Sequence, residues 1–109
     1  MPEFALLFRP TRPVDAEALP RRNTAAREWA LARNRDGTLL TPAPLEDGGV
    51  AVSDRGAEPI AGERGVAAVL IIQAPSLDAA VALAKGHPGL AYGTEIEVRP
   101  VKPVAQPPR

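Results

Sequence analysis

Two strand patterns in the second half of the chain most constrain the fold. Residues 66–74 are apolar at almost every position, so a strand formed there has two faces that avoid water. Residues 95–101 alternate charged and apolar side chains, which is typical of a strand with one solvated face. A helix that begins after Ser76 and ends before Gly86 separates them. This segment therefore predicts a sheet with both central and edge strands.

The rest of the chain supplies the remaining elements. Residues 4–8 form a short apolar run that ends before a proline, which predicts a second buried strand. Residues 15–35 show helical spacing of apolar side chains around Trp29. Residues 50–53 alternate as an edge or hairpin strand does. The glycine-rich residues 54–65 predict a mobile loop.

The order of these elements predicts an α+β fold. Strand, helix, one or two strands, strand, helix, strand is the ferredoxin-like βαββαβ arrangement with an antiparallel sheet. Its first and third strands lie in the centre, and its second and fourth strands lie at the edges. Leu39-Leu40 can begin a short strand, but Pro42 and Pro44 limit its pairing, so residues 50–53 are the expected second strand. Residues 1–101 then form a single domain, and the proline-rich residues 102–109 form a disordered tail.

The composition excludes several classes of function. The 109 residues include 13 basic and 13 acidic ones, so no net field favours nucleic acid or an anionic membrane. The arginines of residues 21–35 lack interleaved aromatic rings, which is typical of a solvated helix face. With no cysteine and one histidine, we expect no metal site and no cofactor. Apolar segments are too short for a signal sequence or a membrane span, so we expect a cytoplasmic protein.

Two helices can shield only one face of the predicted sheet. If Leu70 and Ile72 face the helices, Val69 and Ile71 point to the other side. Leaving a valine or an isoleucine in water forfeits about 1.5–3 kcal/mol each, and a contiguous apolar patch usually marks an interface. We therefore expect a homodimer through the helix-free sheet face. The alternative is that residues 54–65 and the tail cover this face.

Short segments spread along the chain share the pattern of one known family. They are residues 4–9, Trp29, residues 36–39, residues 44–45, residues 76–80, His87-Pro88 and residues 96–101. In this combination the chain resembles the YCII-related proteins, including their DGPF-type branch, over nearly its whole length before the tail. The resemblance implies a ferredoxin-like fold that pairs as a dimeric α/β barrel. It also implies relatives in small-molecule chemistry, and others linked to extracytoplasmic-function sigma factors.

The chain departs from this family at two places. The Asp-Gly-Pro-Phe loop that names the branch is absent, because residues 54–60 read Asp-Arg-Gly-Ala-Glu-Pro-Ile. The YCII proteins proper carry a histidine on the first helix, proposed to work with an aspartate, and this chain has no histidine before His87. The resemblance therefore implies a fold and a dimer without a catalytic pair.

Few side chains are candidates for catalysis. His87 is the only histidine and lies in a loop between the second helix and Pro88. His87 and Glu97 are the candidates for a general base near neutral pH. The alternative role for His87 is structural, as a loop residue that hydrogen-bonds a terminal helix carbonyl.

A larger set of side chains is a candidate for ligand binding. Glu97 and Arg99 share one face of the last strand and would line a cavity between two paired sheets, where Arg99 would bind an anion bidentately. The alternative is a cross-strand ion pair. Arg9 and Asp54 end strands at the expected pocket mouth, or are ordinary solvated strand ends. Trp29 would stack on a ligand, or else anchor the core.

Two main classes of function fit these residues, and the sequence leaves open whether the protein is an enzyme. The first is a non-catalytic or regulatory homodimer that binds a polar or anionic small molecule in the inter-sheet cavity. The second is a cofactor-free lyase, isomerase or hydrolase acting in the same cavity, with His87 or Glu97 as base. The first is favoured, because the histidine of the enzymatic relatives is missing. A sigma-factor-associated regulatory partner is a third alternative that rests on the resemblance alone.

Overall fold

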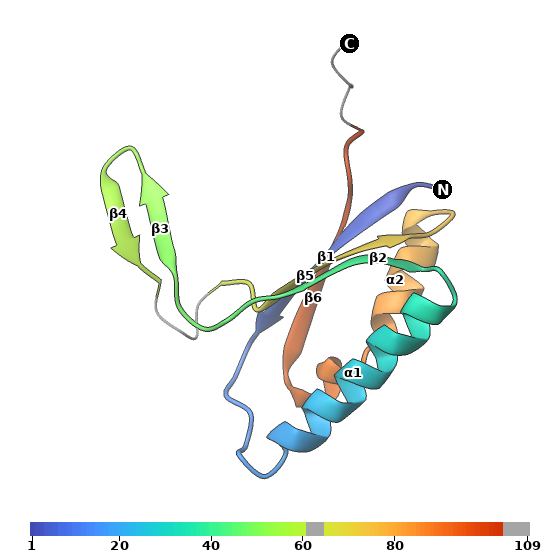
Figure 1. Cartoon of the computed structure of the whole chain (residues 1–109), viewed down its shortest axis with the longest axis horizontal. Coiled ribbons are helices and arrows are strands. Elements are labelled where there is room, and N and C mark those ends of the chain that lie inside the picture. The colour runs from blue at the N-terminus through green and yellow to red at the C-terminus, as the bar shows by residue number, and fades with distance from the viewer. Residues whose placement is uncertain (61–64, 104–109) are drawn as a thin grey trace.

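The chain folds into a four-stranded antiparallel sheet, two helices and a separate hairpin (Figure 1). The computed structural model describes residues 1–60 and 65–103. Its elements, in chain order, are β1 (Glu3–Pro10), α1 (Leu19–Arg35), β2 (Leu39–Pro44), β3 (Val50–Ser53), β4 (Gly56–Pro59), β5 (Ala68–Gln73), α2 (Leu77–Lys85), the 3-10 helix η1 (Pro88–Tyr92) and β6 (Thr94–Pro100). The sheet order β2-β5-β1-β6 confirms the predicted ferredoxin-like fold, with the first and third of its strands in the centre.

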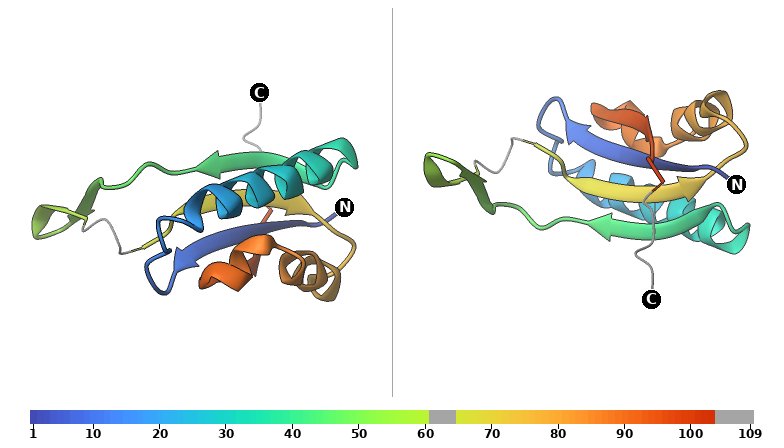
Figure 2. Two further views of the ribbon diagram at one scale, coloured as in Figure 1. Left: turned by 90° about the horizontal axis from the view of Figure 1, so that it is seen from below. Right: turned by 90° about the horizontal axis from the view of Figure 1, so that it is seen from above.

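Both helices lie on one face of the sheet, as Figure 2 shows from two opposite sides. Directly opposed residues in antiparallel strands share a face, and the register sets Leu6 opposite both Leu70 and Val98. These side chains point toward the helices and form the middle of the core. The buried core residues are Phe4, Leu6, Phe8, Leu39, Leu70, Ile72, Ala74, Ala80 and Ala84.

The two helices begin in different ways. Ser76 caps α2, because its hydroxyl accepts the N–H of Ala79 at 3.1 Å, and Asp78 lies in the first turn. Helix α1 has no side-chain cap, and Pro20 lies in its first turn, where a missing N–H costs nothing. It begins at Leu19 rather than at Asp15. A turn at residues 16–18 precedes it, in which the N–H of Ala18 donates to the carbonyl of Asp15 at 2.9 Å. None of the described helices is long and apolar enough to span a bilayer.

The prediction for the second sheet strand was wrong. The edge strand beside β5 is β2, and it contains both Pro42 and Pro44. An edge strand pairs on one side only, so the absent proline N–H groups need not belong to the ladder. The expected strand at residues 50–53 instead pairs with β4, inside the segment that was expected to be a loop. In the turn between β3 and β4, the Ser53 hydroxyl accepts the N–H of Arg55 at 3.2 Å.

The helix-free face of the sheet carries apolar side chains, as expected. Leu7 lies opposite Val69 in the register, and Ile71 follows on the same face; all three are half-buried. Figure 2 shows the β3–β4 hairpin extending beyond the end of the sheet rather than over this face. The expected coverage by residues 61–64 or by the tail at 104–109 lies outside the described residues, as does most of the predicted disordered tail.

Replacing Leu6 tests how far stability depends on the centre of the core. Leu6 is 0% exposed, so Leu6→Ala should lower the free energy of unfolding by about 2–5 kcal/mol. Leu31 of α1 is 43% exposed, and Leu31→Ala is the control, with an expected loss below about 1 kcal/mol. Urea denaturation followed by circular dichroism measures both. Equal losses in the two variants would contradict this placement of the core.

Candidate functional site

An open cavity of about 1300 Å³ lies on the helix-covered side of the sheet. It is bounded by the first half of α1 and by the ends of β1, β2 and β5. Phe8 and Ala30 contribute apolar wall, and His87 and Thr94 contribute polar atoms. Ligand sites are typically apolar concavities of about 300–1000 Å³ with a few polar groups, so a small molecule would fill only part of this space.

His87 is the buried polar residue of the cavity wall, with 8% of its surface exposed. Its backbone N–H donates to the carbonyl of Ala84 at 3.0 Å, which ties it to the end of α2. Its Nδ1 accepts the N–H of Gly89 at 2.9 Å and so caps η1. A Cβ at position 89 would lie 3.0 Å from Nδ1, so any residue larger than glycine would crowd the imidazole.

Two aromatic rings enclose the imidazole. Its centroid lies 4.7 Å from that of Phe8 and 4.8 Å from that of Trp29, both in edge-to-face geometry. This burial disfavours the charged form and lowers the pKa of His87 from 6.5 to about 4. His87 is therefore neutral at neutral pH. Because Nδ1 accepts a hydrogen bond, the proton of the neutral ring belongs on Nε2, which makes Nε2 a donor.

Three arginines border the same cavity. Arg22 and Arg27 come from α1, and Arg12 comes from the segment before it. Arg22 is half-buried, and its guanidinium donates to Asn23 Oδ1 at 3.2 and 2.9 Å. Arg12 lies over Gly93, which has φ +86°, and its Nη2 donates to the carbonyl of Ala91 at 3.4 Å.

The charges around the cavity are unevenly divided. Within residues 1–60 and 65–103, neither Arg12 nor Arg22 forms an ion pair. The acidic residues of the wall, Glu46 and Asp47, come from the segment that follows β2. The cations of the wall therefore come from α1 and the segment before it, and this side is suited to a polar or anionic ligand.

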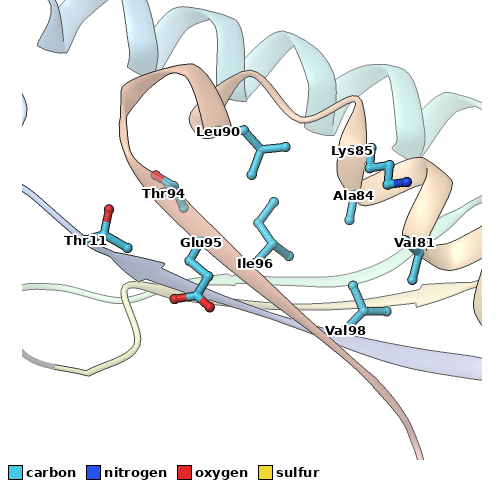
Figure 3. Close-up of a pocket in the computed structure, with 9 residues that line it drawn as sticks. All are labelled: Thr11, Val81, Ala84, Lys85, Leu90, Thr94, Glu95, Ile96 and Val98. Carbon is cyan, nitrogen blue, oxygen red and sulfur yellow. The ribbon is translucent and has the colours of Figure 1, made fainter.

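A smaller hollow of about 530 Å³ lies between α2, η1 and β6 (Figure 3). Figure 3 shows Ile96 and Val98 of β6 pointing toward Val81 and Ala84 of α2, so its walls are mainly aliphatic. Its charged residues are Lys85 and Glu95. It shares Thr11 and Thr94 with the larger cavity, so the two spaces adjoin near the start of β6. It has no counterpart to the buried imidazole.

The structure brings Arg9, Glu97 and Arg99 together on the helix-free face. Arg9 Nε lies 3.9 Å from one carboxylate oxygen of Glu97, and Arg99 Nη1 lies 3.8 Å from the other. All three side chains are at least 40% exposed. None of them lines either of the two cavities described above. In the single chain they form a cross-strand ion network, and their predicted role in an inter-sheet cavity stays a prediction.

The other two candidate binding residues, Asp54 and Trp29, lie in different parts of the fold. Asp54 lies at the exposed turn between β3 and β4, so the structure does not bring it to the end of β1 where Arg9 lies. Trp29 packs against the core from α1 and also contacts His87. The described residues contain no group of three or more side chains able to hold a metal ion.

The sequence did not predict that Arg12 and Arg22 border a cavity. The arginines of α1 were interpreted as a solvated face, because helical spacing alone does not show that the end of the sheet lies opposite Arg22. His87 carried one usable signal, namely its place between a helix stop and a proline. Its aromatic enclosure joins β1, α1 and the start of η1, so no local pattern encodes it.

Comparison with known proteins supports the fold. No family model and no curated protein matches the sequence. Among solved structures, the chain is similar to 5-chloro-2-hydroxyhydroquinone dehydrochlorinase from Burkholderia phenoliruptrix AC1100 in complex with 2,5-dihydroxybenzoquinone. The similarity covers 91% of this chain and 93% of that one, with a TM-score of 0.59 and 18% sequence identity. At this identity the two proteins share a fold.

The buried imidazole should make stability depend on pH. Between pH 6.5 and about 4 the unfolded chain binds a proton at His87 that the folded chain does not, so stability falls as the pH falls. We expect the free energy of unfolding to drop by about 2 kcal/mol between pH 7 and pH 5 from this residue. Urea denaturation at the two pH values measures the drop.

His87→Asn is the matched control for this pH dependence. An asparagine oxygen can still accept the N–H of Gly89 at the start of η1, but it does not titrate. The drop between pH 7 and pH 5 should therefore largely vanish in this variant. An undiminished drop would show that other groups cause it.

Proposed function

We propose that the protein is a non-catalytic domain that binds a small, polar or anionic molecule in the cavity beside His87. The observation that carries this proposal is one neutral buried imidazole beside a cavity whose α1 side is cationic. Nε2–H of His87 would donate to a ligand oxygen, and Arg22 would bind its negative charge. This moves the proposed ligand site from the inter-sheet space to the helix-covered side.

A flat ring with oxygen substituents is the ligand class that fits best. Phe8 borders the cavity next to the imidazole, and Leu19, Ala26 and Ala30 of α1 add apolar wall. The similar dehydrochlorinase was solved with 2,5-dihydroxybenzoquinone, a ring of this kind. The shared fold makes that compound a suitable first probe.

Binding is favoured over catalysis because of the His87 pKa. A base with a pKa of about 4 accepts a proton weakly at neutral pH, and an efficient general base has a pKa near the working pH. The other candidate base, Glu97, lies on the opposite sheet face, paired with Arg9 and Arg99. A cofactor-free lyase, isomerase or hydrolase in this cavity remains the second proposal, since the similar structure is named as an enzyme.

The second part of the proposal is a cytoplasmic homodimer joined through the helix-free sheet face. Leu7, Val69 and Ile71 form the apolar middle of that face, and burying them against a second copy would remove them from water. The Arg9, Glu97 and Arg99 network would then lie at the margin of the interface. A sigma-factor-associated role stays an alternative without a structural observation behind it.

Ligand binding can be located with two arginine variants. Titration of 2,5-dihydroxybenzoquinone by isothermal calorimetry, with the fluorescence of the single Trp29 as a second readout, should show saturable binding. Arg22→Ala should weaken the affinity at least about tenfold, because a charged hydrogen bond is worth roughly 1.5–3 kcal/mol. Arg99→Ala is the control and should change it less than about twofold. The reverse result would place the ligand between two sheets.

Dimerisation can be tested on the sheet face alone. Ile71→Arg places a charge in the middle of the proposed interface and should convert the dimer to a monomer in sedimentation equilibrium. Leu31→Arg is the control, since Leu31 is 43% exposed on α1, on the opposite side of the sheet. A wild-type chain that sediments as a monomer at high concentration would contradict the dimer.

A further inference from the structure

The β3–β4 hairpin, residues 50–59, is amphipathic across its whole length, and we refer to it as the arm. The register sets Val50 opposite Pro59 and Val52 opposite Ala57, and alternate residues share a face. One face is therefore entirely apolar. The opposite face carries Ala51, Ser53, Gly56 and Glu58.

The apolar face of the arm is exposed in the part of the chain that the structure describes. Val50 is 60% exposed and Val52 is 80% exposed. The molecule extends 47 Å along its longest axis, and the arm forms one end of it (Figure 1). Neither β3 nor β4 packs extensively against any other described helix or strand. One further backbone bond, from the N–H of Ile60 to the carbonyl of Gly49 at 2.9 Å, extends the hairpin by one pair toward its base.

Such an arm needs a surface to pack against. A lone two-stranded hairpin is at best marginally stable in water, and it requires a third strand or a packed face. Each exposed valine also forfeits part of the roughly 1.5–3 kcal/mol that burial supplies. The polar face, with Glu58 and Ser53, is suited to water, so the apolar face is the one that a partner would cover.

A second copy of this chain is the partner that the dimensions favour. Four strands of six to eight residues cover about 430 Å² in projection, at roughly 4.8 Å between strands and 3.3 Å per residue. A stable interface buries roughly 800 Å² of accessible surface per partner, a measure that exceeds the flat projection of the same contact. Each face of the arm covers about 130 Å², and in a two-fold dimer each copy both gives an arm and receives one. The two arms would raise the footprint by more than half.

We infer that the arm of each copy clasps the other copy in the homodimer, with Val50, Val52, Ala57 and Pro59 packed against the body of the second chain. The inference rests on the dimer of the proposed function, because it adds the arm to the contact area of the sheet face. It also gives a reason for the position of the arm. Figure 2 shows the arm extending past the end of its own sheet, where it does not obstruct the helix-free face.

Two lysine substitutions on neighbouring residues of β3 test the inference. Val52→Lys places a charge on the apolar face, and Ala51→Lys places the same charge on the polar face, opposite Glu58. Sedimentation equilibrium should show a dimer dissociation constant at least about tenfold higher for Val52→Lys, equivalent to about 1.4 kcal/mol. Ala51→Lys should change it less than about twofold.

A second measurement does not depend on substitution. Hydrogen exchange of the wild-type chain should show β3 and β4 amides protected at concentrations where the dimer forms, and exchanging rapidly under dilution to monomer. A dimer that forms equally well with Val52→Lys, or whose arm amides exchange rapidly throughout, would overturn the clasp and leave the sheet-face dimer intact. A wild-type monomer would overturn both.

Discussion

The pairing of β1 with β5 is the constraint on which the rest of the structure depends. It places Leu6 beside Leu70 and Phe4 beside Ile72, and it brings the two fully buried large side chains, Leu6 and Ile72, into the same layer. The two strands are far apart in sequence, and α1, β2 and the arm lie between them. Because side chains alternate, this pairing also decides what the helix-free face presents.

The proposed site lies at the end of that core, beside the last buried residue of β1. Phe8 is the last buried residue of β1, and Trp29 approaches it from α1, so the ring of His87 is held between them. Enclosure of this kind removes water from the imidazole and keeps it neutral. It thereby favours a fixed hydrogen-bond donor over a proton shuttle. The cations of α1 remain outside the enclosure, where a ligand can reach them.

Two surfaces of this chain, one on the sheet and one on the arm, are apolar and exposed. The helix-free face and the arm both carry aliphatic side chains that the described part of the chain does not bury. Among the described residues, the backbone of the arm pairs only within the hairpin. Contiguous exposed apolar patches usually mark interfaces, and the proposed homodimer would cover both surfaces.

Periodicity alone predicted β1, α1, β5, α2 and β6 in their order, the central positions of β1 and β5 and the alternation of β6, because these follow from which side chains avoid water. The second strand could not be predicted in this way. Proline disfavours a strand locally, yet β2 forms because β5 offers it a partner at the sheet edge. The enclosure of His87, the approach of Arg22 to the cavity and the separation of Asp54 from Arg9 were likewise decided only by tertiary structure, since each depends on the distance between segments that no local pattern encodes.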